Sequence, residues 1–158
     1  MKKTLFLCMA AAMMLCSCGA LKSNSSSTGS SASQTTTNPG TAGQGAGEAL
    51  KALYTQYKAD GKFDYQNMNN IMNALSLIQN CQGLKNNAKD SNYWKSFATG
   101  LIGGSEQLVT EKTSDAVMNG LNTVMESIDT SKMQNMSEKA DAVAKSASQI
   151  GSLLQMFK

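Results

Sequence analysis

Apolar residues recur at three- and four-residue intervals from Glu48 onward, with polar residues between them. This spacing is typical of amphipathic helices. It predicts five of them, at about 48–60, 64–82, 91–104, 113–128 and 137–157. No stretch from Glu48 onward alternates apolar and polar residues as a half-buried strand does. Because connections of a few residues favour antiparallel neighbours, the sequence predicts an all-α fold, a small up-and-down bundle of four to five helices.

Turn and capping residues predict where several of these helices begin and end. Gly61 and Gly83 are placed as C-terminal stops, Asp64 as the N-cap of the second helix, and Asp90 or Ser91 as that of the third. Three glycines at 100–104 either break the third helix or allow a neighbouring helix to approach closely. The stripe of the second helix that is predicted to face the core comprises Met68, Ile71, Met72, Leu75, Ile78 and Cys81.

The segment from Gly19 to Gly47 has a different composition. It consists almost entirely of Ser, Thr, Ala, Gly, Gln and Asn, and its only large apolar residue is Leu21. Such a composition buries too little apolar surface to offset the chain entropy lost on folding. We therefore expect residues 18–47 to be a disordered tether and residues 48–158 to form the helical domain.

The first seventeen residues have the layout of a secretion signal. Lys2 and Lys3 precede an apolar stretch from Leu5 to Leu15, and small residues follow it. The stretch is too short to remain in a bilayer as a spanning helix, which needs roughly 20 apolar residues. Residues 1–17 are therefore predicted to be a signal peptide that is removed.

The sequence Leu15-Cys16-Ser17-Cys18 resembles the lipobox of bacterial lipoproteins. In that family the chain is cut before the last cysteine, whose thiol is diacylated and whose new amino group is usually acylated as well. Cys16 departs mildly from the pattern, because small or β-branched residues are commoner at its position. The resemblance implies that Cys18 carries acyl chains such as palmitate, and two or three acyl chains bind a protein stably to a membrane.

The residues after Cys18 bear on where the anchored protein is located. Lipoproteins retained in the inner membrane can carry aspartate there, and some that reach the cell exterior carry acidic residues. Gly19 to Ser23 contain no acidic residue. We therefore expect an outer-membrane lipoprotein of a Gram-negative cell envelope, anchored at the periplasmic face.

The charge of the chain argues against nucleic acid as a partner. The sequence has 14 lysines, no arginine and 11 acidic residues. Removal of residues 1–17 takes away two lysines and no acid, so 12 lysines against 11 acids leave a net charge of +1. Nucleic-acid-binding domains usually cluster Lys and Arg on one face, whereas these lysines are scattered.

The chain has no histidine, which excludes Ser-His-Asp and Cys-His catalysis and the histidine-containing zinc and di-iron sites. Glu106 and Glu111 are the nearest acidic residues in one region, and helix ends account for them. The segment Asp60–Asp64 lacks the pattern of a calcium loop. Met133 and Met136 offer thioether sulfur, a copper ligand, but methionines at helical spacing more often fill a core.

Cys81 and two aromatic groups are the remaining candidates for a site. Cys81 lies on an apolar stripe without a basic neighbour, so a core position is expected instead of a reactive thiol. The aromatic residues either close the ends of the bundle core or rim a groove for a peptide, lipid or glycan. An Asn/Gln-rich face at residues 66–73 is either solvated surface or a contact face. The aromatic groups are Tyr54, Tyr57, Phe63 and Tyr65, and Tyr93, Trp94 and Phe97.

Two hypotheses about function follow. The first is a membrane-anchored, non-catalytic interaction module that binds an envelope protein. The second is a periplasmic carrier that binds an apolar, lipid-like ligand inside the bundle. An enzyme ranks third, and no cofactor or metal is expected. A pocket above roughly 300 Å³ lined by Leu and Met would favour the carrier, whereas a filled core with an exposed apolar patch would favour docking.

Overall fold

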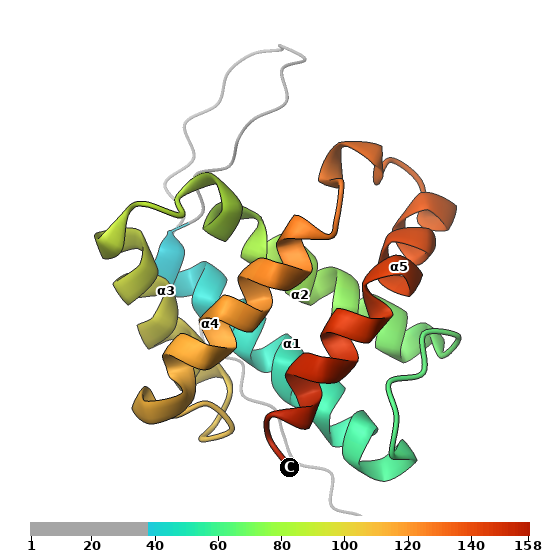
Figure 1. The fold of residues 1–158 in the computed structure, drawn as a ribbon, viewed down its shortest axis with the longest axis horizontal. Coiled ribbons are helices and arrows are strands. Elements are labelled where there is room, and N and C mark those ends of the chain that lie inside the picture. Colours follow the sequence, from blue (N-terminus) through green and yellow to red (C-terminus); the bar gives the residue numbers. More distant parts are fainter. Residues whose placement is uncertain (1–37) are drawn as a thin grey trace, which may run out of the picture. The chain divides into compact units, whose positions relative to one another are not determined.

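The computed structural model describes residues 38–158, and both the predicted signal peptide and Cys18 lie outside this range. The described residues form five α-helices and one short 3₁₀ turn, with no strand among them (Figure 1). The predicted all-α bundle is therefore confirmed. The elements are α1 (Pro39–Asp60), α2 (Met68–Asn86), α3 (Ser91–Gly104), α4 (Glu111–Glu126), η1 (Thr130–Lys132) and α5 (Met136–Gln155).

Helix α1 begins at Pro39, so the predicted boundary at residue 48 is wrong. The Asn38 side chain accepts a hydrogen bond from the Gly40 backbone N–H, and Pro39 has the fixed φ that suits the first helical position. Residues 39–47 belong to the folded domain and not to the tether. The buried residues of this first part of α1 are Ala42, Gly43, Ala46 and Gly47.

Helices α1 and α3 form the most extensive helix pair, and they run parallel. Gly100 of α3 lies against the Gly40 carbonyl of α1, and Gly104 lies one turn further along against that of Gln44. On the α1 side of this contact, a methyl group added at Gly47 would lie 2.5 Å from the carbonyl oxygen of Leu101 in α3. The α3 glycines therefore do not break the helix, and two of them, Gly100 and Gly104, allow the two backbones to touch.

Helix α2 is shifted toward the C-terminus relative to the prediction. It begins at Met68 with Asn67 as its N-cap, and the Asp64 carboxylate instead accepts a hydrogen bond from the Gln66 backbone N–H in the preceding loop. It also passes through Gly83, the predicted stop. A side chain at Gly83 would overlap the Tyr93 hydroxyl, so this glycine makes room for an aromatic residue of α3.

The remaining helices follow the sequence closely. The Asp90 side chain caps α3 by accepting hydrogen bonds from the backbone N–H groups of Asn92 and Tyr93. Helix α5 starts with a capping box in which Asn135 and Glu138 each accept the other's backbone N–H. Gly61 ends α1 in the left-handed conformation, as predicted, with φ of 72°.

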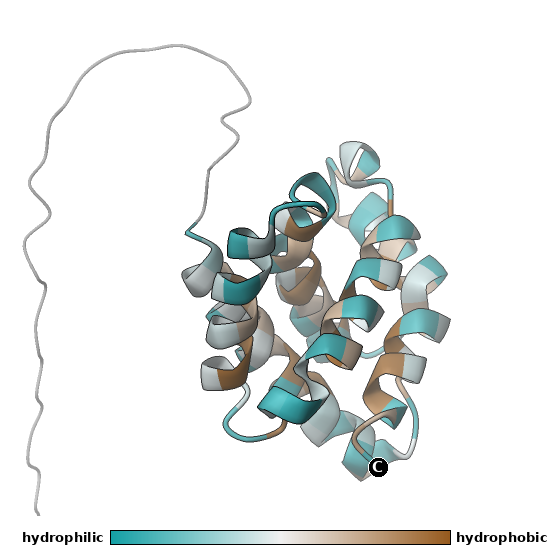
Figure 2. Cartoon of the chain, turned by 60° about the vertical axis from the view of Figure 1, so that its left-hand side comes forward, coloured by the Kyte–Doolittle hydropathy of each residue, from teal (hydrophilic) through white to brown (hydrophobic). Residues whose placement is uncertain are grey.

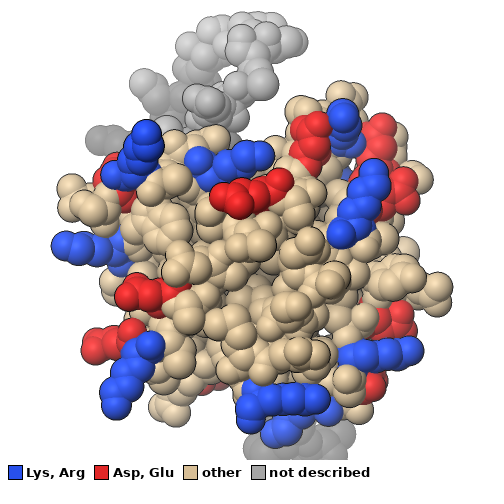
Figure 3. Space-filling model, in the orientation of Figure 1, with Lys and Arg blue, Asp and Glu red and all other residues tan. Residues whose placement is uncertain are grey.

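All five helices contribute to one hydrophobic core. Figure 2 shows apolar residues mainly on the sides of the ribbons that face other helices. Phe97 and a set of leucines, isoleucines and methionines are fully buried in it. On the face seen in Figure 3, lysines and acidic residues are interspersed, and neither sign forms a continuous area.

Candidate functional site: the outer face of helix α2

Helix α2 differs from the other helices in its charge. The twenty residues from Tyr65 to Leu84 include no Asp, Glu, Lys or Arg, and the only charged residue of α2 is Lys85 in its last turn. Helix α3 also has one charge, Lys95, but it lies in the middle of the helix. About a quarter of the residues of a typical soluble domain are charged, so a helix side of this length without charge is unusual.

Three of the five exposed large apolar side chains of the described chain lie at the start of this helix. Their exposed fractions are 47% for Tyr65, 61% for Met68 and 49% for Met72. The spacing of four residues places Met68 and Met72 on one side of the helix, and Tyr65 lies in the turn just before it. Together with the neighbouring polar residues they form the α2 outer face, which comprises Tyr65, Met68, Asn69, Met72, Ser76 and Gln79.

The prediction that Met68 and Met72 face the core is therefore wrong. Ile71 and Leu75 are buried, and because each residue is rotated by about 100° from the one before it, Met72 emerges at the outer side. Spacing alone did not settle this point, because Ala74, Leu77 and Leu84, which were not in the predicted stripe, are buried as well. They shift the apolar side of the helix away from the two methionines.

Polar contacts hold the loop before α2 in place and define where the helix, and with it the outer face, begins. Asn70 is 1% exposed, and its side-chain amide donates a hydrogen bond to the Asp64 carbonyl oxygen at 3.0 Å. The Asn67 side chain caps the helix by accepting the Asn69 backbone N–H. Asn70 is thus not part of the solvated Asn/Gln-rich face in which the sequence placed it.

The first aromatic group closes one end of the core, with one exception. The Tyr54 hydroxyl donates a 2.7 Å hydrogen bond to the Phe157 carbonyl oxygen, and the two rings meet edge to face. Tyr57 is buried, and the Lys158 ammonium lies 5.4 Å from its ring centroid. Tyr65 alone is exposed and belongs to the α2 outer face.

The second aromatic group shapes the α2–α3 corner. Phe97 is fully buried and stacks on Tyr93. The indole N–H of Trp94 donates a hydrogen bond to the Asn87 carbonyl oxygen at 3.1 Å. These contacts are internal, so the residues do not rim a groove.

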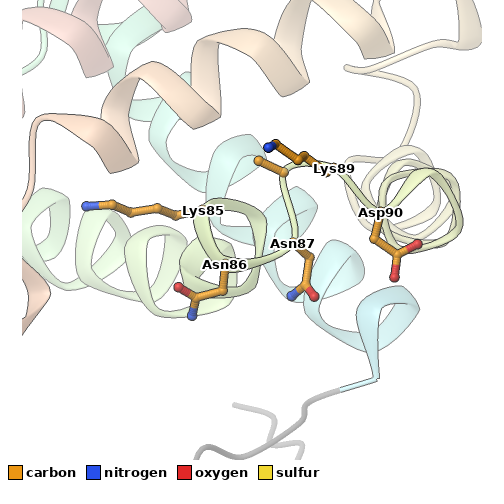
Figure 4. A pocket seen from close by; sticks show the side chains of 6 residues that line it. Lys85, Asn86, Asn87, Lys89 and Asp90 are labelled. Atoms are coloured by element: carbon orange, nitrogen blue, oxygen red, sulfur yellow. The ribbon is translucent and has the colours of Figure 1, made fainter.

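Two depressions in the described residues are surface features lined mainly by polar residues. One, of about 470 Å³, lies at the α2–α3 turn and is lined by residues 85–90. Figure 4 shows Lys85 and Lys89 on one side of this turn and Asn86, Asn87 and Asp90 on the other. The second, of about 490 Å³, lies between the α4–α5 connection and α5, and charged residues such as Asp129 and Lys145 line it. Neither is the Leu- and Met-lined pocket that a carrier needs.

Cys81 is buried, and burial raises the pKa of its thiol. The thiolate, which is the reactive form, is therefore disfavoured in the folded protein. This placement agrees with the core role predicted from the sequence.

The remaining acidic and methionine candidates from the sequence do not form a common site. Asp60 accepts a hydrogen bond from the Gln56 side chain, and Glu106 pairs with Lys51. Met133 is half-buried, whereas Met136 is exposed. Within residues 38–158, no group of three or more Cys, Asp or Glu side chains is arranged to hold a metal ion.

Comparisons with protein-family models, with curated proteins and with solved structures found no match to this chain. Among the helices of residues 38–158, none is long and apolar enough to cross a membrane. The choice of the α2 outer face as the candidate site therefore rests on its exposed apolar side chains and its lack of charge, and not on a related protein. The sequence contained its signal, an uncharged run from Tyr65 to Leu84, but the exposure of its methionines became visible only in the fold.

Proposed function

We propose that this protein is a lipoprotein of the cell envelope whose helical domain is a non-catalytic interaction module. Its anchor is Cys18, at the periplasmic face of the outer membrane, and its binding surface is the α2 outer face. The observation that carries the proposal is the exposure of Tyr65, Met68 and Met72 on a helix side without charge.

The composition of this face is that of a protein interface. Cores of protein–protein interfaces are depleted of charged residues and enriched in Tyr and Met. Methionine adapts its shape to a partner because its side chain is unbranched and flexible. Burial of Asn69, Ser76 and Gln79 is favourable only if a partner returns their hydrogen bonds, which favours a protein over an apolar ligand.

The anchor supports this role by keeping the module at the membrane. Because α1 begins at Pro39, the segment between Cys18 and the domain is shorter than the sequence analysis predicted. The 20 residues between Cys18 and Pro39 can reach at most about 70 Å. The domain would therefore remain within reach of proteins at the same membrane surface, which raises its effective concentration toward them.

Replacement of the anchoring residue tests the first half of the proposal. We expect Cys18→Ala to move the protein from the membrane fraction to the soluble fraction of a Gram-negative host and to abolish incorporation of labelled palmitate. Cys81→Ala is the control and should remain lipidated. Continued palmitate incorporation in Cys18→Ala would contradict the lipobox assignment.

A photo-crosslinking amino acid tests the second half. It is placed at position 72 in the whole chain, and in a matched chain at Thr123, an exposed position of α4. We expect a covalent protein adduct from position 72 and none from position 123. Equal labelling at both positions, or none at 72, would contradict a binding role of the α2 outer face.

A further inference from the structure

We propose that Met68 and Met72 are modification sites, at which peroxides convert the thioether to a sulfoxide and thereby weaken binding by the α2 outer face. This inference rests on the proposed function, because oxidation can weaken binding only at a surface that binds. It does not depend on which protein binds there. Three observations carry it: the exposure of the two side chains, their position side by side and the burial of the core methionines.

The methionines of the described domain differ widely in exposure. Met118 and Met125 of α4 are 2% and 1% exposed, so a dissolved oxidant reaches them only when the core opens. Met133 is partly buried. Oxidation of the folded domain is therefore expected at the four methionines that have about half or more of their surface exposed, which are Met68, Met72, Met136 and Met156.

The reaction transfers one oxygen atom and two electrons. The methionine sulfur attacks one oxygen of hydrogen peroxide, so that the O–O bond breaks and an S–O bond forms, and the other oxygen leaves as water with both protons. The sulfur is oxidised and the peroxide is reduced. A flexible apolar side chain thereby becomes a polar one, a change that disrupts methionine-rich interfaces and that methionine sulfoxide reductases reverse.

Met68 and Met72 are neighbours on the outer side of α2. Residues four apart on a helix have Cβ atoms about 5–6 Å apart, so the two sulfoxides would lie within one small area. Tyr65 would then be the only large apolar residue left on this uncharged face, and a partner would have to bury two unpaired S–O groups. Met136 begins α5 and Met156 follows its last residue, so these two do not form such a pair.

Mass spectrometry of the full-length protein in detergent tests the modification itself. The protein is treated with dilute hydrogen peroxide, catalase stops the reaction, and the oxygen content of each methionine peptide is followed over time. We expect Met68 and Met72 to gain one oxygen each while Met118 and Met125 remain unmodified, and the melting temperature by circular dichroism to stay the same. Equal rates at these four methionines would overturn the inference. A lower melting temperature would mean that oxidation damages the fold, and would overturn it as well.

Photo-crosslinking tests the effect on binding. The photo-crosslinking amino acid is placed at Gln79, an exposed position further along the α2 outer face, so that both methionines remain. Membranes that contain the full-length chain are treated with peroxide, then with catalase, and are irradiated. We expect the yield of the protein adduct to fall about tenfold, because burial of an unpaired polar group weakens binding by at least that factor. Methionine sulfoxide reductases and their reductant should restore the yield, and failure to restore it would overturn the inference.

Two double variants form a matched pair, because each removes two exposed methionines. With Met136→Leu and Met156→Leu, the adduct should remain as sensitive to peroxide as in the natural chain. With Met68→Leu and Met72→Leu, peroxide should leave the adduct yield unchanged, because no sulfoxide can form on the face. A fall of the yield in the second variant would place the oxidation on the partner, and would overturn the inference.

The outcomes separate failure of this inference from failure of the proposed function. An adduct that persists undiminished after Met68 and Met72 are fully oxidised would overturn the effect of oxidation and leave the interaction module in place. Absence of an adduct from the untreated chain would overturn both.

Discussion

Gly100 and Gly103 lie three residues apart in α3 but have different surroundings. A side chain at Gly100 would overlap the Gly40 carbonyl of α1, whereas one at Gly103 would meet no atom within 4 Å. The same glycine-rich sequence therefore contains one residue that close packing requires and one that it does not.

We expect Gly100→Ala to lower the free energy of unfolding by about 2 kcal/mol, because the backbone of α1 must move away to accept the methyl group. Gly103→Ala should raise it by up to about 1 kcal/mol, because alanine is the better helix former. Urea unfolding of the chain from residue 19 measures both. If both substitutions shift the midpoint in the same direction, the close α1–α3 contact is wrong.

Residues at the helix ends follow local sequence patterns in two cases and depart from them in a third. Asp90, one of the two N-caps predicted for α3, and Gly61, the predicted C-terminal stop of α1, have these roles, because a cap depends on the few residues beside it. Gly83 was predicted to end α2 and does not. Its role depends on Tyr93 of another helix, which no local pattern reveals.

At the scale of elements, the start of α1 is the largest departure from the sequence analysis. Residues 39–47 have the composition of a flexible linker, and each glycine costs about 1 kcal/mol in an isolated helix relative to alanine. Packing against α3 overrides this local preference, since small residues allow the two backbones to touch along several turns.

A chain that begins at residue 48, the boundary predicted from the sequence, should therefore be far less stable than one that begins at residue 38. The shorter chain lacks Ala42 and Ala46 and exposes the Phe97 and Leu101 region of α3. We expect a lower melting temperature and a broader thermal transition by circular dichroism. Equal melting of the two chains would show that residues 38–47 do not contribute to the core.

At the scale of the whole molecule, one filled core stabilises the described domain. Cys81 is its only cysteine and lies inside that core. The thiol should therefore become accessible only when the bundle as a whole opens.

We expect a thiol reagent at mildly alkaline pH to label Cys81 at the rate set by global unfolding. Gly100→Ala should accelerate this labelling and Gly103→Ala should slow it.

The stability of the domain should also depend on pH through Cys81. Because burial raises the pKa of the folded thiol, unfolding releases a proton above the unfolded pKa near 9. The contribution of Cys81 to the free energy of unfolding should therefore decline as the pH rises above that value, and Cys81→Ala should remove this part of the decline.

For the labelling experiment, rapid reaction of the folded protein would contradict a buried thiol and place Cys81 at the surface.

The sequence by itself determined the helical class, a range of four to five helices, their approximate positions and several of their caps, because helical periodicity and capping are local properties of the chain. It also contained the uncharged run from Tyr65 to Leu84. Only the tertiary structure decided that residues 39–47 fold, that Gly100 and Gly104 let α3 contact α1, and that Met68 and Met72 face outward. Each of these outcomes depends on which helix lies beside which, and burial against a neighbouring helix outweighs the preference of any single segment.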